Sequence, residues 1–199
     1  MKAKFGLIFI ALGLALLLGS LGLFLYNEKL QNDAAKASEE LMPQIVDAIK
    51  IRQEETEEPE IVAPDEKKMT VIEIDGSDYL GFVGIPAIGI ELPVMADWDY
   101  EKLKTAPCRY SGSVYTEDLV IMAHNYKKHF GRLSQLVNGD QITFTDMDGK
   151  TYRYKVASVE MLPEYAVEEM TSGDFEFTLF TCTYTGESRV AVRCDRISE

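Results

Sequence analysis

The chain has few of the side chains that most often build metal and redox sites. Its 199 residues include three cysteines, at positions 108, 182 and 194, and two histidines, His124 and His129. The cysteine spacings match neither a C-x-x-C redox pair nor a common zinc site, and three thiols cannot all pair within one chain. Two histidines cannot form a histidine-rich metal site. We therefore expect no metal or other cofactor, and at least one free thiol.

Basic side chains are also scarce. Lys and Arg together number 20 against 33 Asp and Glu, which gives a formal net charge of −13. Binding to a phosphate backbone needs clustered Lys and Arg, so a nucleic-acid partner is not expected. The 46% of hydrophobic residues is enough for one globular domain with a substantial core. We expect a single catalytic-sized domain.

One long hydrophobic run stands near the N-terminus. Residues 5–26 form 22 consecutive uncharged positions, which as a helix would cross a hydrocarbon layer roughly 30 Å thick. The alternative is a cleaved secretory signal with "AKA" at 35–37 as its cleavage site, but the apolar region of a signal usually has about 7 to 15 residues. Lys2 and Lys4 precede the run, which favours a cytoplasmic N-terminus. We predict a single-pass anchor within residues 1–26 and an extracellular remainder.

Residues 27–68 are predicted to be an acidic extracellular stalk that is partly helical, since they carry 12 acidic and 6 basic side chains. Pro43 suits the first turn of a short amphipathic helix. The apolar positions at helical spacing are Leu41, Ile45, Ala48 and Ile49. Residues 54–68 contain two prolines, many charges and no aromatics, so a flexible spacer is expected. Binding of calcium or a partner by these carboxylates is the alternative.

From residue 69 to 199 the pattern changes to short β-rich segments separated by turn residues, which is typical of a closed or sandwiched β fold. Short helices are expected at 99–106 and 129–136. Strands are expected at 70–74, 79–85, 90–95, 118–124, 175–182 and 189–197, with two more in 141–162 around an Asp148-Gly149 hairpin turn. Asp146 and Asp148 suggest a calcium loop only superficially, because the other ligands of that motif are missing. We predict an all-β domain.

Two of these strands end in residues that could form a nucleophilic pair. His124 ends "LVIMAH" and Cys182 ends "FTLFTC", so neighbouring strands could present both side chains at one rim of a sheet. A thiol becomes a good nucleophile when an imidazole or another cation lies nearby. The alternative is that Cys182 is a small buried hydrophobe and His124 a polar strand end.

Two arginines follow the cysteine on the next strand. Amide acyl transfer passes through an oxyanion that needs a positive donor, and strand alternation places Arg189 and Arg193 on the same face. Val190, Val192 and Cys194 then occupy the opposite, core-like face. The two arginines lie roughly 13 to 14 Å apart, so only one can reach the thiol. Arg189 is expected at the rim beside Cys182, and Arg193 in a surface salt bridge.

These segments resemble those of the sortases, the membrane-anchored cysteine transpeptidases of Gram-positive bacteria. "TLFTC" at 178–182, "AHNY" at 123–126 and "SRVAVR" at 188–193 are similar to the segments that hold the family's catalytic cysteine, histidine and arginine. The resemblance covers about residues 80–197. It implies an eight-stranded sortase-type β-barrel with a few short helices.

The resemblance also implies a reaction. Cys182 would attack the Thr-Gly bond of an LPxTG-like sorting signal on a surface protein and form a thioacyl enzyme. His124 would protonate the leaving amine and later help to activate the incoming one, and Arg189 would hold the substrate and its oxyanion. Thr181 matches a position that helps to bind the substrate, although its hydroxyl could equally serve packing alone. The acceptor would be an amine of a peptidoglycan precursor or of a lysine in another protein.

Some positions depart from common sortase patterns. The residue before His124 is alanine rather than glycine, Thr183 is not the acid of one subclass, and only about 14 residues separate the last hairpin from the cysteine strand. No C-terminal membrane segment and no clear lid in the stalk are seen, and Asp97-Trp98 is better explained by a packed tryptophan. The short segment before the cysteine strand disfavours the subclass with a long helix inserted there, and the missing C-terminal membrane segment and lid disfavour the pilin-polymerising type. A class D-like or a short class B-like form remains.

The two other cysteines are expected to be buried small residues rather than a disulfide. A non-catalytic, membrane-anchored surface module that keeps the sortase fold and binds a peptide is the alternative function for the whole chain.

Overall fold

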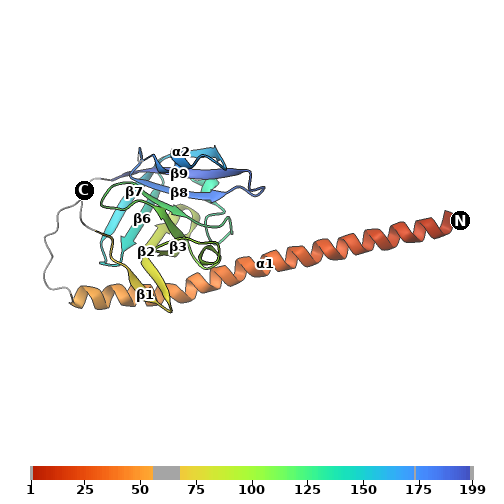
Figure 1. Ribbon diagram of the computed structural model, residues 1–199, viewed down its shortest axis with the longest axis horizontal. Helices are drawn as coiled ribbons and strands as arrows, with labels where there is room; N and C mark the ends of the chain where they lie inside the picture. The colour runs from red at the N-terminus through yellow and green to blue at the C-terminus, as the bar shows by residue number, and fades with distance from the viewer. Residues whose placement is uncertain (1, 56–67, 173, 198–199) are drawn as a thin grey trace.

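The computed structural model describes residues 2–55, 68–172 and 174–197, with side chains described from residue 6. A long helix, α1 (Lys2–Glu55), precedes a β-barrel, and Figure 1 shows its N-terminal half projecting away while its C-terminal half runs beside the barrel. The strands are β1 (Ile72–Ile74), β2 (Ser77–Ile85), β3 (Ile90–Met95), β4 (Cys108–Ser111), β5 (Leu119–Met122), β6 (Gln141–Asp146), β7 (Thr151–Pro163), β8 (Phe177–Cys182) and β9 (Ser188–Arg196). The short helices are η2 (Pro86–Ile88), η3 (Lys102–Lys104), η4 (Leu133–Gln135) and α2 (Val167–Thr171).

Eight of the strands close into a barrel. The sheet order is β1-β2-β3-β4-β5-β8-β9-β7-β6, and a further antiparallel pairing of β2 with β6 joins the ring from β2 round to β6. Strand β1 pairs only with β2 in this sheet, as an added hairpin arm. The prediction of an eight-stranded barrel is confirmed. Within it, β5 and β8 are parallel neighbours.

The barrel closes tightly at Gly81. This residue has a φ of 140°, and a Cβ built on it would lie 1.9 Å from the Thr145 carbonyl oxygen on β6. Only glycine tolerates both this backbone conformation and this approach. The apolar interior that the closure encloses includes Leu80, Val83, Ile121, Phe144, Tyr154, Phe177, Leu179 and Val192.

Helix α1 departs from the predicted stalk. It continues without a break from the apolar run to Glu55, and Pro43 lies inside it rather than in its first turn. The predicted apolar face is confirmed, because Leu41, Ile45 and Ile49 are buried in a cluster with side chains of the barrel. Their partners include Tyr79, Met95, Leu103 and Met147. The free energy gained by packing the helix on both sides of Pro43 exceeds the cost of the backbone hydrogen bond that proline cannot make.

The C-terminal end of α1 is also fixed to the barrel. Arg52 Nε donates to Asp148 Oδ1 at 2.7 Å in the β6–β7 turn. The Asp148 carboxylate accepts from Thr70 Oγ1 as well. Most of the stretch predicted to be a flexible spacer lies outside the described residues, at 56–67.

The first half of α1 has the composition of a membrane span. It is the one helix in the described part of the chain that is long and apolar enough to cross a membrane, with a mean hydropathy of 2.6. Its large apolar side chains between Leu7 and Tyr26 are exposed, as a lipid-facing helix requires.

The structure corrects several predicted boundaries. Strand β5 ends at Met122, so His124 begins a loop instead of ending the strand, and the helices expected at 99–106 and 129–136 are single 3₁₀ turns. Strand β4 and helix α2 were not predicted. Each is five residues long or shorter, which is too short for hydrophobic periodicity to mark it.

Candidate active site

Cys182 and Arg189 lie directly opposite each other on β8 and β9. They are register partners in this antiparallel pair, so their Cβ atoms are about 5 Å apart and on the same face of the sheet. The connecting loop is closed by the Thr183 N–H, which donates to the Ser188 carbonyl at 2.9 Å, and it turns at Gly186 with a φ of 81°. Arg189, rather than Arg193, is therefore the arginine that lies opposite Cys182.

His124 reaches the same rim from β5. Met122 is the register partner of Phe180, and the Ala123 N–H donates to the Phe180 carbonyl at 3.2 Å beyond the end of the strand. Two residues further along the parallel pair, His124 comes level with Cys182. Asn125 Nδ2 then donates to the Thr183 carbonyl at 3.2 Å, which ties the loop of His124 to the loop that follows Cys182. The structure thus brings His124, Cys182 and Arg189 together.

Cys182 is the accessible thiol of the three. All three cysteines are free, and Cys108 and Cys194 are buried, as predicted. Burial raises the pKa of Cys108 to about 12 and raises that of Cys194 further. Cys182 is half-buried at the surface of the barrel. No cluster of three or more potential metal ligands occurs among the described residues.

His124 is half-buried, and its pKa lies below the ordinary value for histidine. Burial is the main cause, and the positive charge of Lys104 adds to it. A lowered pKa makes the protonated imidazole a stronger acid. At neutral pH the neutral imidazole is therefore favoured, and the protonated form is the readier proton donor.

Arg189 uses one end of its guanidinium to hold its own loop. Nη1 donates to the Gly186 carbonyl at 2.8 Å and to the Ser188 carbonyl at 3.2 Å. Among the described residues, neither Nε nor Nη2 makes a hydrogen bond. The side chain is thus anchored at one nitrogen while two other donor groups stay available at the rim.

Arg193 is not at the surface as predicted. Its side chain is 4% exposed beneath helix α2, and it pairs at 3.2 Å with the half-exposed Glu160 on β7. Its remaining hydrogen bonds go to Thr178 Oγ1 at 3.2 Å and to the carbonyls of Met170 and Glu169. The salt bridge was correctly expected, but the burial was missed because α2, which covers it, was not predicted.

Thr181 lies within the barrel wall. It is 3% exposed, and its hydroxyl donates to the Ala123 carbonyl at 2.8 Å. Alternation along β8 turns its side chain away from the face that holds Cys182. This hydrogen bond links β8 to the residue that precedes His124.

An aromatic row beside Cys182 was missed by the sequence reasoning. Phe180, on the same face of β8, contacts Tyr110 edge-on at 5.2 Å between ring centroids, and Tyr110 stacks on Trp98 at 5.7 Å. Trp98 contacts the Tyr110 ring at the surface and is 39% exposed, so it is packed on one side only. Tyr110 lies on β4, which the sequence did not reveal, so only the fold could bring these rings together.

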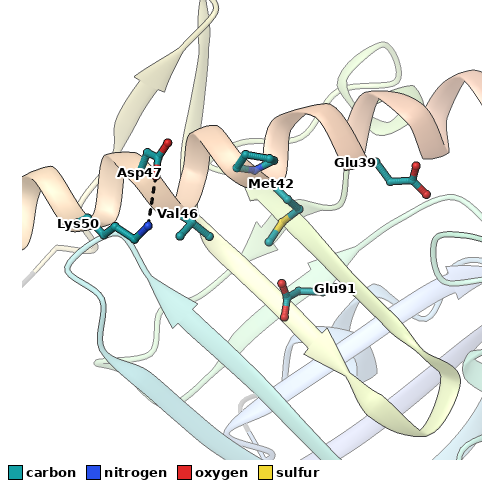
Figure 2. Close-up of a pocket in the computed structure, with 7 residues that line it drawn as sticks. Glu39, Met42, Val46, Asp47, Lys50 and Glu91 are labelled. Carbon is teal, nitrogen blue, oxygen red and sulfur yellow. Dashed lines mark hydrogen bonds and ion pairs between the residues drawn. The ribbon is translucent and has the colours of Figure 1, made fainter.

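A separate pocket of about 450 Å³ lies between α1 and β3, as Figure 2 shows. It is lined by Glu39, Met42, Pro43, Val46, Asp47, Lys50 and Glu91. None of the predicted site residues is among them.

The sequence itself matches a family model described as the Sortase domain over residues 83–197. That match spans more than half of the chain and contains all three residues of the rim. The chain belongs to the sortase family.

Solved structures agree with this assignment. Sortase C1 from Streptococcus suis is 25% identical, with 61% of this chain and 74% of that chain covered and a TM-score of 0.52. Sortase C from Streptococcus pneumoniae is 20% identical, with 82% and 97% covered and a TM-score of 0.57. A sortase D5 transpeptidase from Clostridium perfringens is 17% identical, with 84% and 99% covered and a TM-score of 0.58. The last two share the fold. No curated protein matches the chain significantly.

Proposed function

We propose that this sortase is a cysteine transpeptidase whose reacting groups are Cys182, His124 and Arg189. The observation that carries the proposal is the convergence of these three side chains at one rim, where Cys182 is the accessible thiol. The substrate is a surface protein with a C-terminal LPxTG-like sorting signal, which is cleaved between Thr and Gly.

In the first step, the proton of the Cys182 thiol moves to His124, and the sulfur attacks the threonine carbonyl carbon to form a tetrahedral intermediate. The carbonyl oxygen gains negative charge, which the Nε and Nη2 donors of Arg189 stabilise. His124 then gives its proton to the glycine nitrogen. The C–N bond breaks, the glycine peptide leaves with a neutral amine, and a thioester joins the surface protein to Cys182.

In the second step, an acceptor amine attacks the thioester carbonyl. His124 takes a proton from the amine, the new amide forms, and the Cys182 sulfur leaves. The acceptor is an amino group of a peptidoglycan precursor or of a lysine in another surface protein. No external oxidant or reductant is needed, because the reaction exchanges one amide for another.

The aromatic row beside the nucleophile supports a place for the apolar part of the sorting signal. Phe180, Tyr110 and Met122 belong to one apolar cluster on the face of the barrel that holds Cys182, and Tyr110 and Met122 are its partly exposed members. The leucine and proline of an LPxTG-like signal would lie against it. Thr181 acts indirectly, because its bond to Ala123 holds His124 beside β8.

Helix α1 supports a single-pass anchor with the N-terminus in the cytoplasm and the barrel outside the membrane. A sortase C structure from Clostridium perfringens, 24% identical with a TM-score of 0.56, was solved with a C-terminal cell wall sorting motif. That relative supports surface proteins as the substrate class here.

The experiment uses the full chain in detergent micelles, because a fragment that starts at residue 69 would lose the buried side chains of α1. Incubation with a labelled LPxTG-type peptide should give a thioacyl adduct visible by mass spectrometry. Cys182→Ala should abolish the adduct, and Cys108→Ala, the matched control, should keep it. A folded wild-type chain that binds sorting peptides but forms no adduct with any of them would favour the non-catalytic surface module.

A further inference from the structure

We propose that helix α1 takes part in the active site through three positioning residues, Ser38, His129 and Tyr126, which fix the orientation of His124. The inference rests on the proposed function, because it assumes that His124 is the proton donor. It assigns to the stalk helix a role beyond joining the barrel to a membrane.

The contact begins at Ser38, which is 2% exposed on α1. Its hydroxyl donates to the Thr105 carbonyl at 2.9 Å and lies 3.3 Å from Nε2 of His129. The hydroxyl has a single proton, so its oxygen can only accept from the histidine. The ring proton of His129 therefore resides on Nε2, and the helix defines the tautomer.

His129 is fully buried and neutral. Burial lowers its pKa to about 4, the charge of His124 acts in the same direction, and a hydrogen bond with the Ala34 backbone on α1 opposes the shift. Its Nδ1 makes no hydrogen bond within the described part of the chain. A buried polar atom without a partner is costly, so simple packing would be served better by an apolar side chain.

Three aromatic rings lead from this contact to the candidate proton donor. The ring centroid of Tyr126 lies 5.6 Å from that of His129 and 4.9 Å from that of His124. Such distances are those of rings in direct contact. A shift of the His129 ring would therefore press on Tyr126 and, through it, on His124.

Hydrogen bonds within the loop backbone leave these three rings little room to absorb a shift. The Phe130 N–H donates to the His124 carbonyl at 3.2 Å, and the N–H groups of His129 and Gly131 donate to the Tyr126 carbonyl at 2.9 and 3.0 Å. A Cβ on Gly131 would lie 2.4 Å from the Asn125 carbonyl oxygen, so only glycine fits this closure.

Two other contacts hold α1 against the same loop. The Lys127 N–H donates to Gln31 Oε1 at 3.2 Å, and Lys128 pairs with Glu39 at 3.7 Å. Helix α1 thus touches the loop on both sides of Ser38, at Gln31 and at Glu39.

The test compares four variants of the full chain in detergent micelles, using the transpeptidation of a sorting peptide as the assay. Ser38→Ala and His129→Phe remove the polar contact, and His129→Phe keeps the buried ring. Leu41→Ala is the matched control, because it weakens the packing of the same helix one turn away without touching His129. His129→Gln, whose side-chain amide can donate in place of Nε2, tests for rescue.

We expect kcat to fall roughly 10- to 100-fold in Ser38→Ala and His129→Phe, with KM changed less than two-fold, because small errors in orientation reduce turnover by such factors. The limb of the pH–rate profile that belongs to His124 should move to higher pH, because its ring becomes more exposed while the charge of Lys104 stays the same. Leu41→Ala should lower Tm and keep both kcat and this limb. His129→Gln should recover part of kcat.

The proposal is overturned if Ser38→Ala and His129→Phe keep the wild-type kcat and pH profile. It is also overturned if their losses of kcat are matched by Leu41→Ala at an equal loss of Tm. A wild-type chain that forms no thioacyl adduct would instead contradict the proposed function, so the two failures are distinguishable.

Discussion

The two ends of one face of β9 show how the same residue type takes different roles. Arg189 lies at the open rim beside Cys182 and bonds only to loop carbonyls. Arg193, four residues away on the same face, is buried under α2 with Glu160 and two backbone carbonyls. What covers the strand therefore decides whether a guanidinium can meet a substrate or is committed to holding the fold together.

The two histidines repeat this contrast. His124 is half-buried at the rim, and His129 is fully buried five residues later against α1. Exposure separates a group that can exchange protons with a substrate from one that stays neutral.

Arg189→Ala should lower kcat/KM for a sorting peptide by about 100- to 1,000-fold, because it removes the donors proposed for the oxyanion. Tm should change little, since the side chain at the rim bonds only to its own loop. Steady-state kinetics and a thermal melt on the same sample check both parts. Arg189→Ala at wild-type activity would show that another group supplies the positive charge.

Arg193→Ala should act on stability. Removing Arg193 leaves buried acceptors, among them two backbone carbonyls of α2, without their donor, whereas the half-exposed Glu160 carboxylate can turn to water. We expect a loss of about 3 kcal/mol in the free energy of unfolding. The catalytic activity per folded molecule should stay within a few-fold of wild type. Denaturant unfolding measures the loss, and Glu160→Gln, which keeps a hydrogen-bond acceptor, should cost less. A selective loss of activity in Arg193→Ala would reverse the roles of the two arginines.

Acid should destabilise the fold through His129. Its pKa is lowered to about 4 in the folded chain and is ordinary in the unfolded chain, so the unfolded state binds the proton first. Above about pH 6.5, where His129 is neutral in both states, it does not reduce the free energy of unfolding. As the pH falls towards 4, about 3 kcal/mol of that free energy is lost. Comparing wild type with His129→Phe by urea unfolding at several pH values isolates this part. Equal pH slopes in the two chains would contradict it.

Lys104→Glu should have the smallest effect. The positive charge of Lys104 lowers the pKa of His124, so reversing that charge should raise it. The limb of the pH–rate profile that reports His124 should move to higher pH, with little change in the maximal rate. Lys155→Glu is the control, because it reverses the same charge at an exposed position of β7, away from the loop of His124. Identical shifts in both variants would indicate a general surface effect.

Much of the fold follows from local patterns. Alternation marked most of the strands and correctly placed Val190, Val192 and Cys194 in the barrel interior. Helical spacing identified the face of α1 that packs on the barrel. The short elements β4 and α2 escaped, because four or five residues contain no measurable period. Their absence hid the aromatic row and the burial of Arg193.

The amino-acid sequence narrowed the candidate reacting groups to Cys182 at the end of one strand, His124 just after another, and the arginines of the strand that follows. The packing of distant segments settled which of these are open to a substrate, and it carries α1 past residue 26 to contact the loop after His124. The physical reason is that alternation and spacing are local properties of the chain. Burial instead depends on whatever distant segment packs over a residue, as α2 does over Arg193 and α1 over His129.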